Sequence, residues 1–187
     1  MPGLDETRPF VPLRIAVLTV SDTRELVDDK SGATLVERIA ASGHSLAQRG
    51  IVRDEVPAIR AQVERWIADP GVDVVITTGG TGFTGRDVTP EAVEPLFEKR
   101  MDGFATLFHM VSFAKIGTST VQTRTTAGVA NATYIFCLPG SPGACRDAWD
   151  EILVHQLDYR FRPCNFVELM PRLDETMRRA KAQGATA

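Results

Sequence analysis

Residues 77–92 form a glycine-rich stretch, TTGGTGFTGRDVTPEA, whose residue types suit the binding of an anion. Glycines such as Gly79, Gly80 and Gly82 let the backbone bend sharply and approach a ligand with N–H groups directed toward it. A helix predicted to begin near Thr89 adds a positive dipole end, which also favours negative charge. The stretch therefore predicts a phosphate-binding loop. The alternative is that these glycines only form a tight turn after a strand.

Asp87 lies within this stretch, and a carboxylate beside a bound phosphate needs a cation between the two groups. Mg²⁺ is the usual bridge, so Asp87 is predicted to bind Mg²⁺ or to position water. The alternative is that Asp87 only caps the helix near Thr89. No Lys-Ser or Lys-Thr pair follows the glycines, and GGTGFTG lacks the GxGxxG order. The loop is therefore neither a Walker P-loop nor a dinucleotide-binding fingerprint.

Three apolar, β-branched runs predict buried parallel strands, and each run ends in polar or glycine-rich residues. They cover residues 14–20, 72–77 and 133–138, and a weaker strand lies near 50–52. Residues with helical spacing lie between the strands or follow them, at 31–41, 57–68, 89–99 and 141–157. The pattern is thus an alternation of strands and helices.

This alternation predicts an α/β fold in three layers, with a mostly parallel sheet that has helices on both faces. In such sheets the ligand-binding crevice lies beyond the carboxyl ends of the strands, and right-handed crossovers bring these ends to one edge. We therefore expect the following groups to converge: Ser21 and Asp22, Asp54, the loop at 77–87, and the turn at 139–142.

The overall composition narrows the class of protein. The chain has 187 residues, of which 43% are hydrophobic and 24% charged, and these values predict one globular domain. No apolar run approaches the roughly 20 residues that a membrane span needs, and the acidic, proline-containing N-terminus is unlike a secretion signal. We therefore expect a soluble, cytoplasmic protein without a membrane partner. A net charge of −3 without a basic cluster disfavours nucleic acid as a partner.

The segments TTGGTG and RDVTPEA, with an upstream strand that ends in Ser-Asp, resemble the MoaB/MogA family of molybdenum cofactor biosynthesis. Four further segments resemble the MoaB branch rather than MogA: RAQVERWI, GFATLFHMVSFAKIGTSTVQTRTTAGVAN, LPGSPGACRDAW and RPCNF. The resemblance covers residues 14–166 and leaves 1–13 and 167–187 as tails. It implies a single molybdopterin-binding domain over residues 1–187.

The resemblance also implies an activity, in which Mg-ATP adenylylates molybdopterin and pyrophosphate is released. The two aspartates associated with activity in the family match Asp54 and Asp87, and RDVTPEA, which some MoaB-branch proteins lack, is complete here. The implied substrate- and nucleotide-binding residues are Ser21, Asp22, Gly79, Gly80, Thr81, Gly82, Ser141 and Pro142. Two functions remain open: an adenylyltransferase, and a noncatalytic pterin-binding or scaffold protein of the same pathway.

An apolar segment at residues 104–113 predicts either part of the core or a subunit interface. It contains Phe104, Leu107, Phe108, Val111 and Phe113. The family resemblance implies self-association as a trimer, or as a hexamer made of two trimers. Residues 171–187 have helical spacing, which predicts a short helix that is either frayed or packed on a neighbour.

Overall fold

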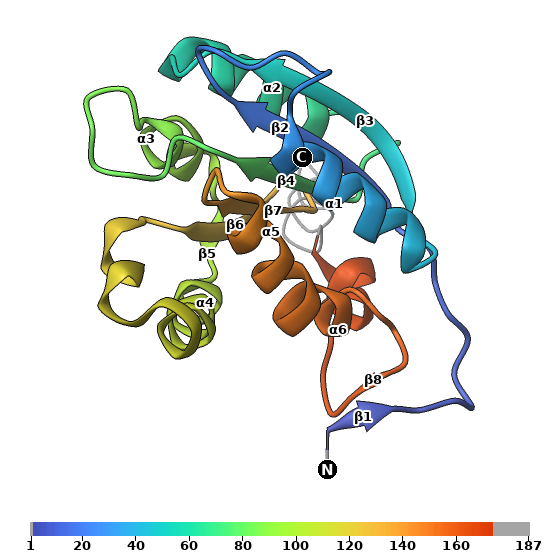
Figure 1. Cartoon of the computed structure of the whole chain (residues 1–187). Coiled ribbons are helices and arrows are strands. Elements are labelled where there is room, and N and C mark those ends of the chain that lie inside the picture. Colours follow the sequence, from blue (N-terminus) through green and yellow to red (C-terminus); the bar gives the residue numbers. More distant parts are fainter. Residues whose placement is uncertain (1, 174–187) are drawn as a thin grey trace, which may run out of the picture.

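A six-stranded sheet lies at the centre of the computed structural model, which describes residues 2–173 (Figure 1). Its strands follow the order β3-β2-β4-β7-β6-β5. Their bounds are Arg14–Val20 for β2, Ser45–Val52 for β3, Val74–Thr78 for β4, Lys99–Arg100 for β5, Thr126–Ala130 for β6 and Thr133–Leu138 for β7. Strands β3, β2, β4 and β7 are parallel to one another, whereas β6 is antiparallel to both of its neighbours. The predicted mostly parallel sheet is confirmed.

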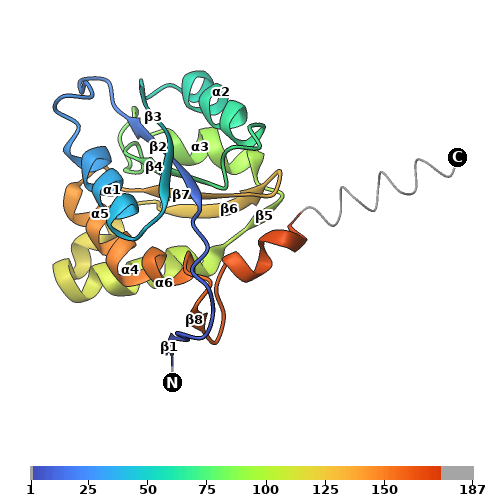
Figure 2. The same cartoon turned by 90° about the vertical axis from the view of Figure 1, so that its right-hand side faces the viewer.

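Helices cover both faces of this sheet, as predicted (Figure 2). On one face lie α1 (Lys30–Ala41), α4 (Asp102–Ile116), α5 (Pro142–Ala148), a π-helical turn at Trp149–Leu153 and α6 (Val154–Gln156). On the other face lie α2 (Val56–Ile67) and α3 (Thr89–Val93). Successive side chains of a strand point to opposite faces, so Ile15 and Val17 join the first core cluster while Ala16 and Leu18 join the second. The central strands are apolar throughout because both of their faces are buried.

The β6–β7 hairpin was not predicted from the sequence. Its two loop residues, Asn131 and Ala132, have φ values of 47° and 61°, which are those of a tight type I′ turn. Ala130 pairs with Thr133 directly across this turn. Because β6 is antiparallel to the other long strands, its amino end lies at the same edge of the sheet as their carboxyl ends.

The helix predicted at 89–99 is wrong in its extent. The α-helix ends at Val93, a 3₁₀ turn follows at Glu94–Leu96, and Lys99 then enters β5. Pro95 lacks an N–H group and its ring is incompatible with a continuing α-helix, which explains the early end. Thr89 also does not cap α3, because its hydroxyl donates to the carbonyl of Gly79 instead.

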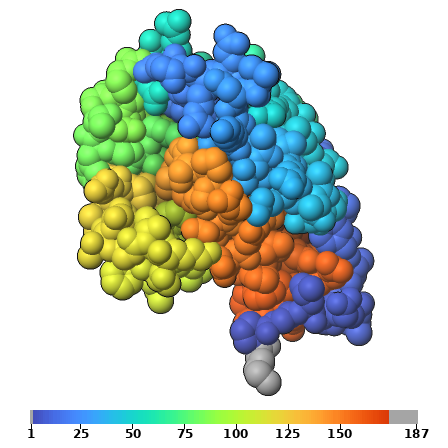
Figure 3. All heavy atoms as spheres, in the orientation of Figure 1, coloured from blue at the N-terminus to red at the C-terminus, as the bar shows by residue number. Residues whose placement is uncertain are grey.

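Both ends of the described chain pack beside each other. Strand β1 (Gly3–Leu4) pairs with β8 (Phe161–Arg162), and the blue N-terminal segment lies against the orange-red segment in Figure 3. Arg8 forms an ion pair of 2.6 Å with Glu168, at the start of the 3₁₀ helix Val167–Arg172. The helix predicted for 171–187 lies largely outside the described residues. None of the helices in residues 2–173 is long and apolar enough to cross a membrane.

Asp29 anchors the start of α1 to the sheet. This carboxylate is buried and accepts hydrogen bonds from the Gly32 N–H at 2.9 Å and the Thr19 hydroxyl at 2.7 Å. The Arg49 guanidinium also donates to it at 2.9 Å. Burial opposes ionisation, but these three donors outweigh it and lower the pKa of Asp29 below its ordinary value. One side chain therefore fixes α1 against both β2 and β3.

We expect Asp29→Ala to lower the free energy of unfolding by about 3 kcal/mol at pH 7, because removal of one partner leaves the Arg49 charge uncompensated. The stabilisation by a carboxylate with a lowered pKa is complete above its ordinary value of 3.8 and is lost as the pH falls through the folded-state pKa. Urea unfolding at pH 7 and in acid should show the difference shrinking in acid. The exposed neighbour Asp28→Ala is the control, and an equal loss there would contradict the anchoring role.

Candidate functional site

A polar cavity of about 310 Å³ opens at the carboxyl edge of the parallel strands. It is lined by Thr19, Val20, Ser21, Thr23, Arg24, Ser31, Asp54, Thr78, Gly79, Gly80, Asp87 and Gly140. These residues come from the ends of β2 and β4, from the loops that follow β2, β3, β4 and β7, and from the first turn of α1. A larger cavity of about 430 Å³ lies near β5 and Phe166, but none of the predicted site residues lines it. The convergence expected from the sequence is therefore found in the smaller cavity.

The turn after β4 fits only glycine at two positions. Gly79 and Gly80 have φ values of 107° and 63°, in the region that side-chain-bearing residues rarely adopt. A Cβ at Gly79 would lie 2.2 Å from the Val20 carbonyl oxygen, and one at Gly80 would lie 2.4 Å from the Thr89 hydroxyl. The carbonyls of both glycines accept hydrogen bonds from Thr89, whereas the N–H groups of Gly80 and Thr81 have no acceptor among the described residues. This turn thus leaves N–H groups available to an anion.

Asp87 holds the next part of the loop together. Its Oδ2 accepts hydrogen bonds from the N–H of Thr84 at 2.8 Å and from the Thr84 hydroxyl at 2.6 Å. A Cβ on Gly82 would lie 2.7 Å from the same oxygen, which explains the glycine there. Burial opposes ionisation of Asp87, but the donors from Thr84 and Gly82 outweigh it and lower its pKa. Asp87 does not cap α3, so the helix-cap alternative is wrong.

Asp54 has the opposite electrostatic environment. Burial, and then the nearby carboxylates of Asp22 and Asp87, raise the pKa of Asp54 above its ordinary value. The Asp22 backbone N–H and the Arg86 charge favour the ionised form of Asp54, but burial and the two carboxylates outweigh them. Asp22, in contrast, forms a two-point ion pair with Arg86 at 2.7 and 2.8 Å, and the hydrogen bonds from Arg86 lower its pKa. Among residues 2–173, Asp54 therefore has no ion pair like that of Asp22, and its pKa stays raised.

The remaining predicted residues divide into two groups. Ser21 lines the cavity, and its hydroxyl accepts hydrogen bonds from the Thr23 and Arg24 N–H groups. The others lie next to the cavity without lining it: Asp22, Thr81, Gly82, Ser141 and Pro142. Ser141 caps α5 by accepting a hydrogen bond from the Ala144 N–H at 3.1 Å. Its structural role is thus established, and a pterin contact stays a prediction.

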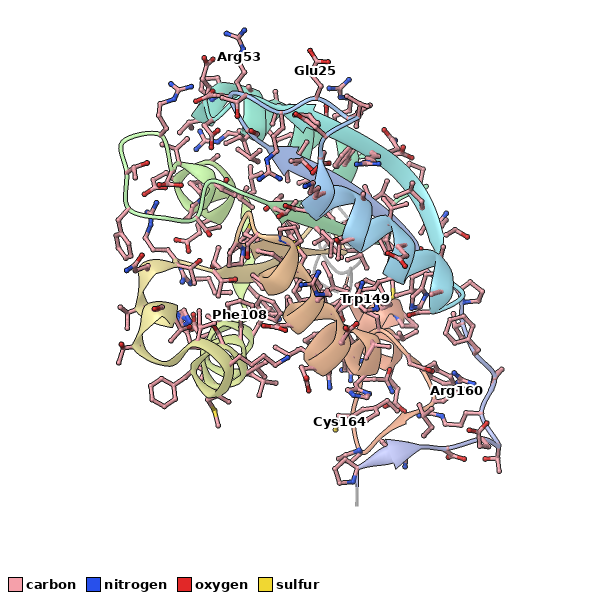
Figure 4. The ribbon with its side chains drawn as sticks, in the orientation of Figure 1. Glu25, Arg53, Phe108, Trp149, Arg160 and Cys164 are labelled. Atoms are coloured by element: carbon pink, nitrogen blue, oxygen red, sulfur yellow. The ribbon has the colours of Figure 1, made fainter. Side chains whose placement is uncertain are left out.

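Sequence reasoning missed one wall of the cavity. The Arg24 guanidinium donates to the Ser31 hydroxyl at 3.3 Å, and that hydroxyl donates to the Gly140 carbonyl at 2.8 Å. This chain of contacts joins the loop after β2, the first turn of α1 and the turn after β7. At the same edge Arg53 and Glu25 project outward, whereas Phe108 and Trp149 lie deep in the molecule (Figure 4). The serine in DDKSG, just inside a predicted helix start, was the available signal for this wall.

Within residues 2–173, no group of three or more His, Cys, Asp or Glu side chains is arranged to hold a metal ion by itself. A divalent cation at Asp87 would therefore need ligands from phosphate oxygens and water. Mg²⁺ is commonly bound in this way, through one or two carboxylates together with substrate phosphates. The donor set around Asp54 and Asp87 is thus compatible with Mg²⁺ only in the presence of such a ligand.

The fold and the site define an α/β protein with a polar cavity at the carboxyl edge of its sheet. Several known proteins are similar to this chain in sequence. A family model described as a probable molybdopterin binding domain matches residues 16–159. Molybdenum cofactor biosynthesis protein B of Escherichia coli (strain K12) is 53% identical over 157 residues, which cover 84% of this chain and 92% of that protein. The protein of the same name from Bacillus subtilis (strain 168) is 40% identical over 151 residues, covering 80% and 89%.

Solved structures agree with these relatives. A crystal structure of molybdenum cofactor biosynthesis protein B matches with a TM-score of 0.81 and 35% identity, over 90% of this chain and 99% of that chain. The tungsten cofactor synthesizing protein MoaB from Pyrococcus furiosus matches with a TM-score of 0.69 and 34% identity, over 76% and 91%. The chain belongs to the MoaB/MogA family, on the MoaB side, as its sequence predicts. Its role is in molybdenum cofactor biosynthesis.

The raised pKa of Asp54 predicts that this carboxylate destabilises the fold at neutral pH. A raised folded-state pKa has no effect below the ordinary value of 3.8 and costs stability once the pH rises through the folded-state pKa. We therefore expect Asp54→Asn to melt at a higher temperature than the wild type at pH 7 and at the same temperature near pH 3. Asp87→Asn should shift the melting temperature downward at pH 7, because the pKa of Asp87 is lowered. A lower melting temperature for Asp54→Asn would contradict this account.

Proposed function

We propose that this protein adenylylates molybdopterin with Mg-ATP, and that the polar cavity binds the reacting phosphates. The observation that carries the proposal is the convergence of Asp54, which follows β3, with the glycine turn and Asp87, which follow β4, on one cavity. The turn offers N–H groups to an anion, and the two aspartates offer ligands to a cation. The names of the relatives, which refer to molybdenum cofactor biosynthesis, support the choice of molybdopterin.

The electrostatic environment of Asp54 and Asp87 suits the binding of Mg²⁺. Asp54 is half-buried and lies near two other carboxylates that raise its pKa. A divalent cation would relieve this repulsion, and we assign Asp87 as its ligand with Asp54 nearby. When bound there with ATP, Mg²⁺ neutralises phosphate charge.

The chemistry is a transfer of the adenylyl group. An oxygen of the molybdopterin phosphate attacks the α-phosphorus of ATP, a new phosphorus–oxygen bond forms, and the bond from the α-phosphorus to the pyrophosphate oxygen breaks. Adenylylated molybdopterin and pyrophosphate are the products. Little covalent chemistry is asked of the protein, which must hold two anions in line and balance their charge. Gly80, through its free N–H group, and Asp87 perform these two tasks in this proposal.

Purified protein with molybdopterin, ATP and Mg²⁺ provides the direct assay. We expect Asp87→Asn to reduce the rate of adenylyl-molybdopterin formation by on the order of 10² or more, because it removes charge that acts in the transition state. Molybdopterin affinity should change little. Chromatography of the products measures the first effect and equilibrium binding measures the second.

Asp28→Asn serves as the matched control, since Asp28 is an exposed carboxylate outside the cavity. Equal rates for wild type, Asp28→Asn and Asp87→Asn would remove Asp87 from the chemistry. No product from the wild type, together with intact pterin binding, would favour the noncatalytic pterin-binding or scaffold function.

We also propose that the protein forms a trimer, or a hexamer of two trimers, through the outer face of α4. The segment at 104–113 proves to have two sides: Phe104 and Phe108 lie in the core, and Val111 packs partly against it. Five apolar side chains on α4 and the 3₁₀ helix Gly117–Gln122 are exposed: Leu107, Met110, Phe113, Ile116 and Val121. An exposed apolar patch of this kind suits a contact between identical chains.

Phe113→Asp should dissociate this assembly, because it introduces a charge among apolar side chains that pack in the oligomer. Light scattering coupled to gel filtration should give a mass near three or six chains for the wild type and a smaller mass for the variant. Val27→Asp is the control, since Val27 is 92% exposed and lies far from α4 in sequence. A wild-type monomer at micromolar concentration would overturn the proposal.

A further inference from the structure

Arg124 contacts the glycine-rich loop at several points. Its backbone N–H donates to the Thr81 carbonyl at 2.8 Å, and its Nε donates to the Gly82 carbonyl at 2.8 Å. One terminal nitrogen donates to the Asp87 carbonyl at 2.6 Å, and the other forms an ion pair with Glu91 in α3. A single residue therefore contacts both ends of the 82–87 segment and the helix that follows it.

The position of Arg124 follows from the topology of the sheet. It precedes β6, whose amino end lies at the edge where the parallel strands end. The green segment that contains the loop and the yellow segment that leads to Arg124 lie next to each other on the surface in Figure 3. The neighbouring Thr123 strengthens the junction, because its hydroxyl is 2.8 Å from the hydroxyl of Thr81.

A guanidinium group suits the binding of several loop carbonyl groups for a geometric reason. Its donors lie in a rigid planar fork, so it satisfies several fixed carbonyl groups at once, which a lysine ammonium on a flexible stem does not do. The Arg124 side chain is 28% exposed, so solvent has limited access to these bonds. By binding the carbonyl oxygens of Gly82 and Asp87, Arg124 restricts the backbone on both sides of the segment that carries the Asp87 carboxylate.

We propose that Arg124 is a positioning residue. It holds the 82–87 segment so that the Asp87 carboxylate and the free N–H groups of the turn can contact the same ligand. The contacts of Arg124 do not depend on the proposed function, but their effect on nucleotide binding rests on it. Arg124 does not line the cavity and acts only through the loop. Its loss opens the loop, separates Asp87 from the glycine turn and weakens the binding of Mg-nucleotide.

Arg60 provides a matched control. Its guanidinium donates to the carbonyls of Ala92 and Glu91, each at 3.1 Å, and so binds the same helix α3 without touching the loop. Arg124→Gln and Arg60→Gln therefore each remove an arginine from backbone carbonyls in the same part of the molecule. Arg124→Lys keeps the charge but not the fork, and it provides a second variant if Arg124→Gln fails to fold.

Two measurements test the role on the purified full chain. Hydrogen exchange of the Thr84 and Asp87 amides, which are hydrogen-bonded within the loop, should be at least about tenfold faster without ligand in both Arg124 variants than in the wild type and in Arg60→Gln. Calorimetry with a non-hydrolysable ATP analogue and Mg²⁺ should show the dissociation constant rising about tenfold or more in the Arg124 variants only. Raising the Mg²⁺ concentration should partly restore their binding.

Each outcome decides a separate question. Unchanged loop exchange in a folded Arg124 variant would overturn the positioning role. Faster exchange with unchanged nucleotide affinity would also overturn it, since the loop geometry would then have no consequence for binding. Faster exchange in a protein whose wild type binds no nucleotide would support the hold of Arg124 on the loop and refute the proposed nucleotide function instead. Equal effects of Arg60→Gln and Arg124→Gln would reduce Arg124 to a general stabilising residue.

Discussion

The close approach of three strand ends is the constraint on which this site depends. Beyond β4 the backbone passes so near β2 and β7 that a Cβ at Gly79 would lie 2.2 Å from the Val20 carbonyl oxygen, and one at Gly140 would lie 3.1 Å from the Cα of Gly79. Only backbone atoms fit between these strand ends. The glycine turn therefore presents peptide groups rather than side chains to the cavity. The two aspartates that line the cavity come from the loops after β3 and β4.

The carboxylates around the cavity differ because of what surrounds each one. Arg86 compensates Asp22 and Thr84 supplies hydrogen bonds to Asp87, whereas the weaker influences on Asp54 leave its pKa raised. A protein selected only for stability would have no reason to keep a half-buried carboxylate at position 54 with a raised pKa. Functional sites commonly hold such groups at the expense of stability, since a ligand supplies the missing partner. Asp54 is thus the carboxylate of this group whose charge a bound ligand would compensate.

The parallel part of the fold was predictable because local pattern and tertiary environment agree there. The run at 14–20 is apolar because β2 is buried on both faces, and the polar residues directly after each strand were correctly expected at one edge. The features that the sequence did not predict depend on tertiary structure. TTAGVAN was not recognised as a strand and turn, since Asn131 and Ala132 form a hairpin turn without the glycine that usually signals one. Without β6, nothing in the sequence places Arg124 at the site, because its partners are backbone carbonyls, which leave no mark on residue type.

The route of the chain from α4 to β6 has a consequence for how distant events combine. Helix α4 continues through Gly117–Gln122 directly into Thr123 and Arg124, so the exposed apolar face and the residues that hold the glycine-rich loop share one short stretch of backbone. If packing of this face and binding of a ligand both ordered this stretch, each event would favour the other, and thermodynamic linkage would make the effect equal in both directions. The fold thus connects the exposed apolar face covalently to the residues that hold the glycine-rich loop.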